Sequence, residues 1–562
     1  MKIIKLLICL SLLSTALTSC YKDLGNDVYH EINELEIKGL LNRYERDQDD
    51  SLNIPVDLSG TQYSDSSKFT YEWEISRRIV SRYKDLKIKV NMNVGEHFAR
   101  FTITDKANGA KSYFRFSLRV SSSTAGDLIV VLSKYKGEAE LSYKRLDKEG
   151  EFSINYYKER FGESLGTEPK SVYVNYNFNS GKIPFTFVNT QGGVQVLTAE
   201  GLKILDKNSM GPNANPDKIT AASFTSFLPP YPVKDVSNFK PEFVLYQVGN
   251  WIYTPYGGIN QAGQMFLISG GAMYYSVMSN SVNTVSINEK IENGYLAPAL
   301  CYASVANSVP DPTRPLNTKG YVLSQYMLLF DNTNGKFVYS NGGSYVTKIV
   351  SSDKKNPIEY LPSFPGYKMI YASHTSAPNK CVAILHNGIQ AKIVYLTVPA
   401  TSTQAKTMPF AIEGIAEVSK DVLREDSKFY MMRYSPYLLF SSGSKIYRYN
   451  VLSAIGNNPP TDIIADLNTM NYGTEATIPC FTVSRTEKTL LMAVSRYKNE
   501  TELNGTQPLG DVVQMDFNKS TISLEFKKKY EGVSGKPADI QIKYQVFYRD
   551  GFNKDGELVD KI

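Results

Sequence analysis

The sequence is poor in the residues that build the common catalytic metal centres. Its 562 residues include only four histidines and five cysteines. The spacings His-Glu-x-x-His, His-x-His and Cys-x-x-Cys do not occur. Zinc proteins take their ligands from such clusters. The sequence therefore argues against a metal enzyme of this kind, and we predict neither a metal nor a cofactor.

The sequence also lacks a large excess of charge of either sign. The chain carries 62 Lys and Arg against 56 Asp and Glu, a formal net charge of +6. A domain that binds nucleic acid usually has a strongly basic face, so we expect no nucleic-acid partner. No nucleophile elbow, phosphate-binding loop or dinucleotide fingerprint occurs in a strand–helix context. The sequence therefore names no catalytic residue.

Long hydrophobic runs are missing, apart from a short one at the start. A basic start at Met1–Lys5 precedes a mostly apolar stretch over residues 6–17. Twelve residues are too few to cross a bilayer, and this layout is typical of a secretory signal. We therefore predict a signal peptide over residues 1–19.

The end of this signal contains a candidate lipidation site. Leu17-Thr18-Ser19-Cys20 resembles the bacterial lipobox, in which a peptidase cuts before a cysteine that becomes diacylated. The resemblance implies a membrane anchor on Cys20 and a lipidated tether over residues 20–34. Lys22-Asp23 is similar to the surface-export signal of Bacteroidota lipoproteins, which implies the outer membrane and its exterior face. The alternative is an ordinary secreted protein.

The aromatic residues favour β-structure. Tyr (39) and Phe (26) far outnumber Trp (2), and both suit half-buried strands. Short runs that alternate apolar and polar residues predict a β-sandwich over residues 35–120 with Trp73 in its core. The runs are 52–58, 69–75, 86–90, 98–103 and 114–120. This stretch resembles the PKD-like immunoglobulin-type domain, on Tyr71-Glu72-Trp73 and Phe101–Asp105. Residues 121–126 are predicted to be a linker.

Residues 127–562 repeat a β-hairpin. The apolar strands of seven such hairpins begin at 128, 194, 265, 326, 382, 437 and 490. A near-regular repeat of this kind predicts a β-propeller, here with seven blades. The alternative is a two-sheet sandwich or another all-β domain. Helical turns are expected only at 41–50 and 413–424, so the predicted fold is all-β.

Aromatic residues in loops broken by Pro and Gly are the main candidates for ligand binding. Rigid rings suit stacking on sugars or contacts with peptides, although they also fill gaps between blades. His374 and Arg433 join these candidates because their loops would line the mouth of the propeller. The aromatic candidates are Trp251, Tyr253, Tyr256, Tyr231, Phe364 and Tyr367. Cys301, Cys381 and Cys480 are predicted to be buried thiols, with one disulfide left open.

The whole arrangement resembles the PKD-like surface lipoproteins of Bacteroidota. The likeness rests on the lipobox, the PKD-like stretch, Asp127–Leu132 and Gly443–Tyr449. Such proteins resemble accessory components of Sus-type uptake, in which a SusC-like transporter and a SusD-like lipoprotein act with other surface lipoproteins. The resemblance implies that the protein captures an oligomeric nutrient without catalysis, with peptide preferred and glycan as the other option. It also implies that the protein docks on that importer. A propeller-based hydrolase or lyase and a purely structural scaffold are the alternatives.

Overall fold

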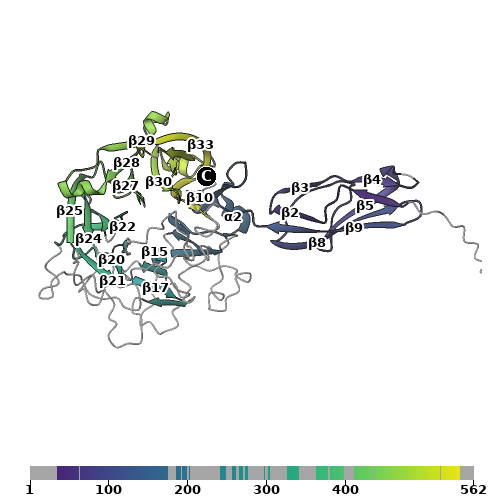
Figure 1. The fold of residues 1–562 in the computed structure, drawn as a ribbon, viewed down its shortest axis with the longest axis horizontal. Helices are drawn as coiled ribbons and strands as arrows, with labels where there is room; N and C mark the ends of the chain where they lie inside the picture. The colour runs from purple at the N-terminus through teal and green to yellow at the C-terminus, as the bar shows by residue number, and fades with distance from the viewer. Residues whose placement is uncertain are drawn as a thin grey trace, which may run out of the picture. The chain divides into compact units, whose positions relative to one another are not determined.

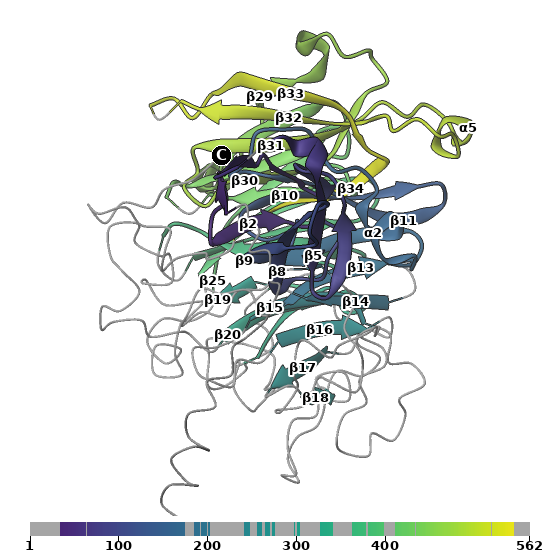
Figure 2. The same cartoon turned by 90° about the vertical axis from the view of Figure 1, so that its right-hand side faces the viewer.

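The computed structural model separates the chain into two compact units, Met1–Ser123 and Thr124–Ile562, and each is described by itself. Both consist mainly of β-strands (Figure 1 and Figure 2). Within the described residues, no helix is long and apolar enough to span a membrane. The described residues are 34–62, 64–174, 185–190, 193–198, 201–202, 241–247, 256–260, 265–269, 272–275, 297, 301–303, 326–340, 362–377, 380–397, 411–432, 434–518, 520–544 and 562.

The first unit contains one five-stranded sheet and two strand pairs. The order in the large sheet is β2-β9-β8-β5-β6, and β2 runs parallel to β9. Its strands are β2 (Arg43–Asp47), β5 (Phe69–Ile75), β6 (Arg78–Ser81), β8 (Gly95–Asp105) and β9 (Lys111–Ser121). The pairs are β1 (Leu35–Lys38) with β4 (Asp57–Gly60) and β3 (Ser51–Ile54) with β7 (Leu86–Lys89), and η1 (Ser66–Lys68) is a short 3-10 helix.

Trp73 is the centre of the first unit's core, as predicted. Its side chain is fully buried, and its ring centroid lies 4.2 Å from that of Phe101 and 6.0 Å from that of Phe116. Its indole N–H donates a hydrogen bond to the carbonyl of Tyr83 at 2.9 Å. The one polar atom of this large ring is therefore satisfied, which removes the cost of burying it.

Strand replaces most of the two segments in which helical turns were predicted. One such turn is found at the end of the second segment, where the Val422 and Leu423 N–H groups both donate to the Ser419 carbonyl at 3.0 Å. Residues 41–50 contain β2, in which Tyr44 is buried between exposed Arg43 and Glu45, a strand period. Residues 413–424 overlap β25 (Ala411–Ser419), which pairs with its neighbour over its whole length. Cross-strand pairing decides the structure here, because short amphipathic runs fit either period.

The second unit contains seven antiparallel sheets in its described residues. We number them along the chain. Sheet 1 is β10 (Leu128–Tyr135), β11 (Glu138–Arg145) and β34 (Lys536–Lys543), and sheet 2 is β12 (Pro169–Val174), β13 (Phe185–Thr190) and β14 (Gly193–Thr198). Sheet 3 is β15 (Pro241–Gln247), β16 (Tyr256–Asn260), β17 (Met265–Ser269) and β18 (Ala272–Tyr275), and sheet 4 is β19 (Cys301–Ala303), β20 (Tyr326–Asp331) and β21 (Lys336–Ser340).

The last three sheets have four strands each. Sheet 5 is β22 (Lys368–His374), β23 (Lys380–His386), β24 (Gln390–Thr397) and β25. Sheet 6 is β26 (Phe429–Met431), β27 (Tyr437–Ser442), β28 (Lys445–Asn450) and β29 (Asp462–Asp466). Sheet 7 is β30 (Thr477–Val483), β31 (Thr489–Ser495), β32 (Gly510–Phe517) and β33 (Leu524–Ser534). The helices are α2 (Tyr156–Phe161), η5 (Val451–Gly456), η6 (Leu467–Met470) and α5 (Glu500–Leu503).

Neighbouring sheets share their hydrophobic cores. Five buried clusters each combine residues from two successive sheets, from sheet 4 through sheets 5, 6, 7 and 1 to sheet 2. A single sheet could not bury both of its faces, so this stacking provides the core of the unit. Members drawn from both sides are Phe330 and Met369, Ile393 and Phe440, Leu439 and Met492, Leu491 and Val131, and Leu132 and Val188.

The two ends of the second unit meet in sheet 1. Strand β34 is the last of the described strands but pairs antiparallel with β10, the first strand of the unit, from Leu128 opposite Lys543 onward. β34 also contacts β30 of sheet 7 and β12 of sheet 2. In Figure 1, β30 and β33 accordingly lie beside β10. The strands that open successive sheets therefore lie next to one another.

Candidate functional site

Polar and aromatic side chains connect the first strands of five successive sheets. We call this set the first-strand chain, and β34 takes the first position in sheet 1. The chain begins between sheets 5 and 6, where the hydroxyl of Tyr371 accepts a hydrogen bond from the Met431 N–H at 3.1 Å. The ring of Tyr371 also stacks on Phe429, with centroids 4.9 Å apart. The first-strand chain consists of Tyr371, Tyr430, Glu487, Arg485, Tyr544 and Asp539.

Glu487 links sheet 6 to sheet 7. It lies in the turn between β30 and β31 and is buried. Tyr430 of β26 donates its hydroxyl to one carboxylate oxygen at 3.1 Å, and the Tyr434 N–H donates to the other at 3.3 Å. Both oxygens of this carboxylate are thus engaged by the preceding sheet. The Tyr434 side chain itself is exposed.

Arg485, in the same turn, links sheet 7 to sheet 1. Its backbone N–H donates to the hydroxyl of Tyr544 at 2.9 Å, and Tyr544 directly follows β34. Its guanidinium carbon lies 4.3 Å from the centroid of the Tyr544 ring. Both side chains are buried. A cation placed over a ring in a desolvated position is a favourable contact of about 2 kcal/mol.

Asp539 of β34 links sheet 1 to sheet 2. Its carboxylate accepts hydrogen bonds from the N–H of Val172 on β12 and from its own neighbour Ile540, both at 2.9 Å. Burial raises the pKa of Asp539, while the charge of Lys428 and these two N–H groups oppose that rise. Lys428 immediately precedes β26, so charges from sheets 6 and 1 influence each other across the first strands.

This arrangement is better suited to binding than to acid–base chemistry. A catalytic carboxyl needs a free oxygen that can meet the substrate. Both oxygens of Glu487 and the carboxylate of Asp539 already accept hydrogen bonds from neighbouring sheets. What the first-strand chain offers is tyrosine rings beside groups of both charges. These groups suit a ligand with apolar and charged parts.

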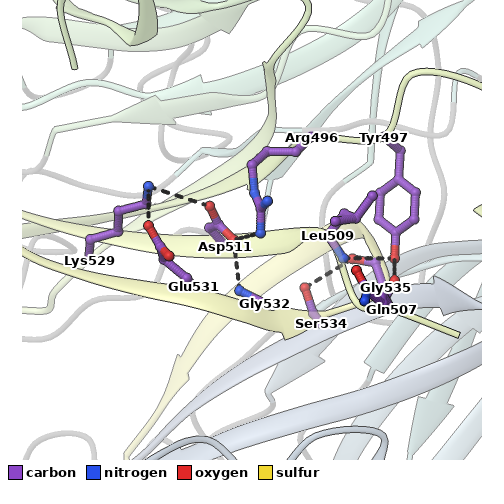
Figure 3. Close-up of polar contacts among 10 residues, drawn as sticks. All are labelled: Arg496, Tyr497, Gln507, Leu509, Asp511, Lys529, Glu531, Gly532, Ser534 and Gly535. Carbon is purple, nitrogen blue, oxygen red and sulfur yellow. Dashed lines mark hydrogen bonds and ion pairs between the residues drawn. The ribbon is translucent and has the colours of Figure 1, made fainter. Parts of the chain in front are cut away.

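A second charged cluster holds the connection between β31 and β32. Asp511 is fully buried and accepts hydrogen bonds from Arg496 Nη2 and the Gly532 N–H, both at 2.8 Å. Lys529 Nζ lies 3.9 Å from its other oxygen and 2.6 Å from Glu531 (Figure 3). Two cations and an N–H group compensate the charge of this carboxylate, so its role is to hold these groups in place.

Further hydrogen bonds tie down the connection itself, residues 496–509. The hydroxyl of Tyr497 accepts a hydrogen bond from the Leu509 N–H at 3.0 Å and donates to the Gln507 carbonyl at 3.4 Å (Figure 3). Tyr135 of β10 donates its hydroxyl to the Thr506 carbonyl at 2.6 Å. The cluster around Asp511 therefore fixes a long surface loop to sheets 7 and 1.

Two of the predicted ligand-binding aromatics lie in the core. Phe364 and Tyr367 are buried in the cluster between sheets 4 and 5, with ring centroids 6.5 Å apart. Tyr367 donates its hydroxyl to Gln390 at 3.2 Å, and Lys392 lies 5.3 Å from its ring centroid. These contacts favour the alternative reading, in which the rings fill the space between sheets.

The other predicted residues have varied positions. His374 ends β22, is half-buried and pairs with Cys381 across the ladder. Tyr256 begins β16, but its side chain lies outside the described part. The remaining predictions also fall outside the described residues, namely Cys20, Tyr231, Trp251, Tyr253 and Arg433. Arg433 adjoins Tyr434, whose N–H reaches Glu487.

Sequence reasoning picked out no member of the first-strand chain. Its members are spread from Tyr371 to Tyr544 and form no local motif. One signal was available in the repeat. The turn with Arg485 and Glu487 follows the first strand of sheet 7, and Arg433-Tyr434 follows the first strand of sheet 6. Aligning the hairpin repeats would have placed these turns together.

Two predicted free thiols are found as expected. Cys381 and Cys480 are buried thiols that form no disulfide. Burial raises the pKa of the Cys480 thiol well above its ordinary value, and Asp539 adds to the rise. Cys301 lies in β19, and its side chain is outside the described part.

Comparison with known proteins identifies the N-terminal part of the chain. Residues 20–169 match the PKD-like family. The match confirms the predicted PKD-like domain, and it also extends beyond the first unit, through β10, β11 and α2 to the start of β12. No curated protein matches the chain.

Several solved structures share parts of the fold at low identity. A quinonprotein alcohol dehydrogenase-like protein from Bacteroides thetaiotaomicron is 10% identical with a TM-score of 0.43, covering 92% of this chain and 100% of its own. Oligopeptidase B from Leishmania major is 9% identical with a TM-score of 0.30, covering 73% of this chain and 41% of its own. Oligopeptidase B from Trypanosoma brucei is 8% identical with a TM-score of 0.32, covering 67% and 44%. Likenesses this distant carry no argument about activity. The PKD-like match therefore characterises residues 20–169 alone.

Proposed function

We propose that this protein is a non-catalytic lipoprotein of the outer membrane that captures an oligomeric nutrient at the cell surface. The second unit is then a closed seven-bladed β-propeller, with sheets 1 to 7 as its blades. The captured nutrient is preferably peptide, and glycan is the second choice. The protein passes it to an importer formed by a SusC-like transporter and a SusD-like lipoprotein.

The first-strand chain carries the proposal of nutrient capture. It brings Tyr430, Glu487, Arg485, Tyr544 and Asp539 from sheets 6, 7 and 1 together at or beside the first strands. A peptide presents backbone amides, apolar side chains and charges of both signs. Tyrosine rings beside Arg485 and Lys428 can meet the apolar side chains and the negative charges, while Glu487 and Asp539 hold these groups in place. A neutral glycan would use the rings and hydroxyls but not the charges.

The pairing of β34 with β10 supports the closed propeller. A sheet that combines the first described strand of the unit with the last one joins the two ends of the ring, which is what a closed propeller requires of its blades. Shared cores connect six sheets in the cyclic order 4, 5, 6, 7, 1 and 2. The lipid anchor is supported by the lipobox-like end at Cys20, and the PKD-like match begins at this residue.

The anchor and the importer are tested by purifying the tagged protein from outer membranes in mild detergent. We expect a SusC/SusD-like pair and a bound oligomer to co-purify. Cys20→Ala is the control, because it removes the acylated group and should release the protein from the membrane. If wild-type protein is recovered alone, under conditions that keep such importers intact, the importer proposal is wrong. A turnover screen would then test the hydrolase or lyase alternative.

The binding site is tested with two variants of the first-strand chain. Tyr430→Phe removes one hydroxyl, and Glu487→Ala removes the carboxylate that joins sheets 6 and 7. Mixed oligopeptides and mixed oligosaccharides serve as separate probes in calorimetric titrations. Glu475→Ala, an exposed carboxylate outside the first-strand chain, is the matched control. We expect weaker peptide binding in both variants. Tyr430→Phe should melt slightly below wild type, because Glu487 loses a donor, but it should still be folded. Unchanged isotherms would contradict the assignment.

A further inference from the structure

The outer face of strands β8 and β9 in the first unit is unusually rich in exposed aromatic and arginine side chains. We call it the β8–β9 face. Residues that alternate with the core members Phe101 and Phe116 point away from the core. On β8 they are Glu96, Phe98, Arg100 and Thr102, and on β9 they are Tyr113, Arg115, Ser117 and Arg119.

Two aromatic rings on this face are left in solvent. Phe98 is 81% exposed and Tyr113 is 53% exposed, although both lie within long, regular strands. Phe98 is directly opposite Ser117, so Arg115 and Arg119 are its diagonal neighbours on the same face. Aromatic residues and arginine are the types that dominate binding energy at protein interfaces.

The charges on this face are unevenly compensated. Arg100 lies directly opposite Arg115 in the ladder, and like charges in this position are unfavourable. Arg100 is paired with Glu74 at 2.6 Å and lies over the Tyr113 ring, 5.5 Å from its centroid. Arg115 is exposed and makes no ion pair with any described residue. A carboxylate supplied from outside would compensate it.

The mixture of charges indicates what kind of partner fits. Glu45 and Glu96 pair with Arg43 at 3.0 and 3.8 Å beside the exposed rings. A face that mixes arginines with these carboxylates lacks the uniformly basic character that an anionic membrane or a polyanion selects. A folded protein can present one carboxylate to Arg115 and apolar surface to Phe98 while leaving the glutamates in water.

We propose that the β8–β9 face is a docking site for a partner protein that places a carboxylate beside Arg115 and apolar side chains on Phe98 and Tyr113. The inference rests on the proposed function, because it takes the SusC/SusD-like importer as that partner. The PKD-like unit then holds the importer, while the second unit holds the nutrient.

The test compares importer recovery among full-length, lipidated variants expressed in the native membrane. Phe98→Ser and Arg115→Glu change the proposed face, and each should lower the recovered importer at least tenfold. Tyr83→Ser and Lys89→Glu are matched controls, because they remove an aromatic that is also highly exposed and reverse an exposed charge elsewhere in the unit. The controls should recover the importer as wild type does. Melting temperatures confirm that all four variants fold.

The outcomes separate this inference from the proposed function. If wild type and all four variants bring down the importer equally, the docking face is wrong and the importer proposal stands. If wild type brings down no importer, both fail. A second assay uses mixed phosphatidylglycerol and phosphatidylcholine vesicles with the unlipidated mature chain. Vesicle binding that Arg115→Glu abolishes would assign the face to the membrane and overturn the protein partner.

Discussion

Protonation of Glu140 should set the pH dependence of stability in the second unit. This residue lies on β11, is only 3% exposed, and accepts a hydrogen bond from the Lys158 N–H of α2 at 3.3 Å. Burial raises its pKa from 4.5 to about 7, and repulsion by Glu138 adds to the rise against the opposing hydrogen bonds. An acid with a raised pKa in the folded state stabilises the fold when protonated. That stability is lost as the pH rises from 4.5 to 7.

The magnitude follows from the two pKa values. A rise from 4.5 to about 7 is worth about 3 kcal/mol once the pH is above both. Glu140→Gln is neutral at every pH and keeps an acceptor for the α2 N–H. It should therefore stabilise the unit by about 3 kcal/mol at pH 8 and by only about 1 kcal/mol at pH 5, where wild-type Glu140 is protonated in the folded state.

Calorimetric melting measures this difference. The second unit has 439 residues (562 − 123), so about 3 kcal/mol corresponds to a shift of about 3 °C in Tm. Glu475→Gln, at an exposed surface pair, should leave Tm unchanged at both pH values. A shift in Glu140→Gln that is equal at pH 5 and pH 8, or absent at both, would refute the reasoning.

Three further substitutions and one labelling experiment test other parts of the molecule. Trp73→Ala should destabilise the first unit by about 4 kcal/mol, because it empties a buried site, and urea unfolding measures this. Asp511→Ala should lower the Tm of the second unit by about 3 °C in calorimetry, since it leaves Arg496 without its buried partner. Trp251→Ala should weaken peptide capture without changing Tm, and an unchanged binding isotherm would count against it. Cys381 and Cys480 should react with a thiol reagent only in denaturant, and rapid labelling of the native protein would contradict their burial.

The predicted β-hairpins agree well with the strand pairs of the sheets. Six of the seven hairpins pair as expected, including β10 with β11, β20 with β21 and β31 with β32. The three others are β17 with β18, β23 with β24 and β27 with β28. Strands β10, β23 and β31 are buried on both faces, so they appear as continuous apolar runs. The run at Val194–Leu197 instead pairs back with β13.

The first strands were harder to predict, and the candidate site depends on them. β26 has only three residues, which is too short to show an apolar run. β34 contains the half-buried Ala538 and Asp539, which interrupt its apolar residues. The hydrogen bond between Tyr430 and Glu487 joins residues 57 positions apart. The one between Val172 and Asp539 joins residues 367 positions apart. Such proximity follows from the order of the sheets, which no local pattern contains.

The pairing of β34 with β10 has a consequence for how this protein is made. Leu128 and its ladder partner Lys543 are 415 positions apart (543 − 128). β10 therefore cannot pair with β34 until almost the whole chain has been synthesised. Contacts between distant residues form slowly, and unpaired strand edges invite aggregation in the interval. If the chain is exported, as proposed, it must be shielded until its end arrives. A chain that ends before Lys536 would lack the strand that completes sheet 1 and should be degraded.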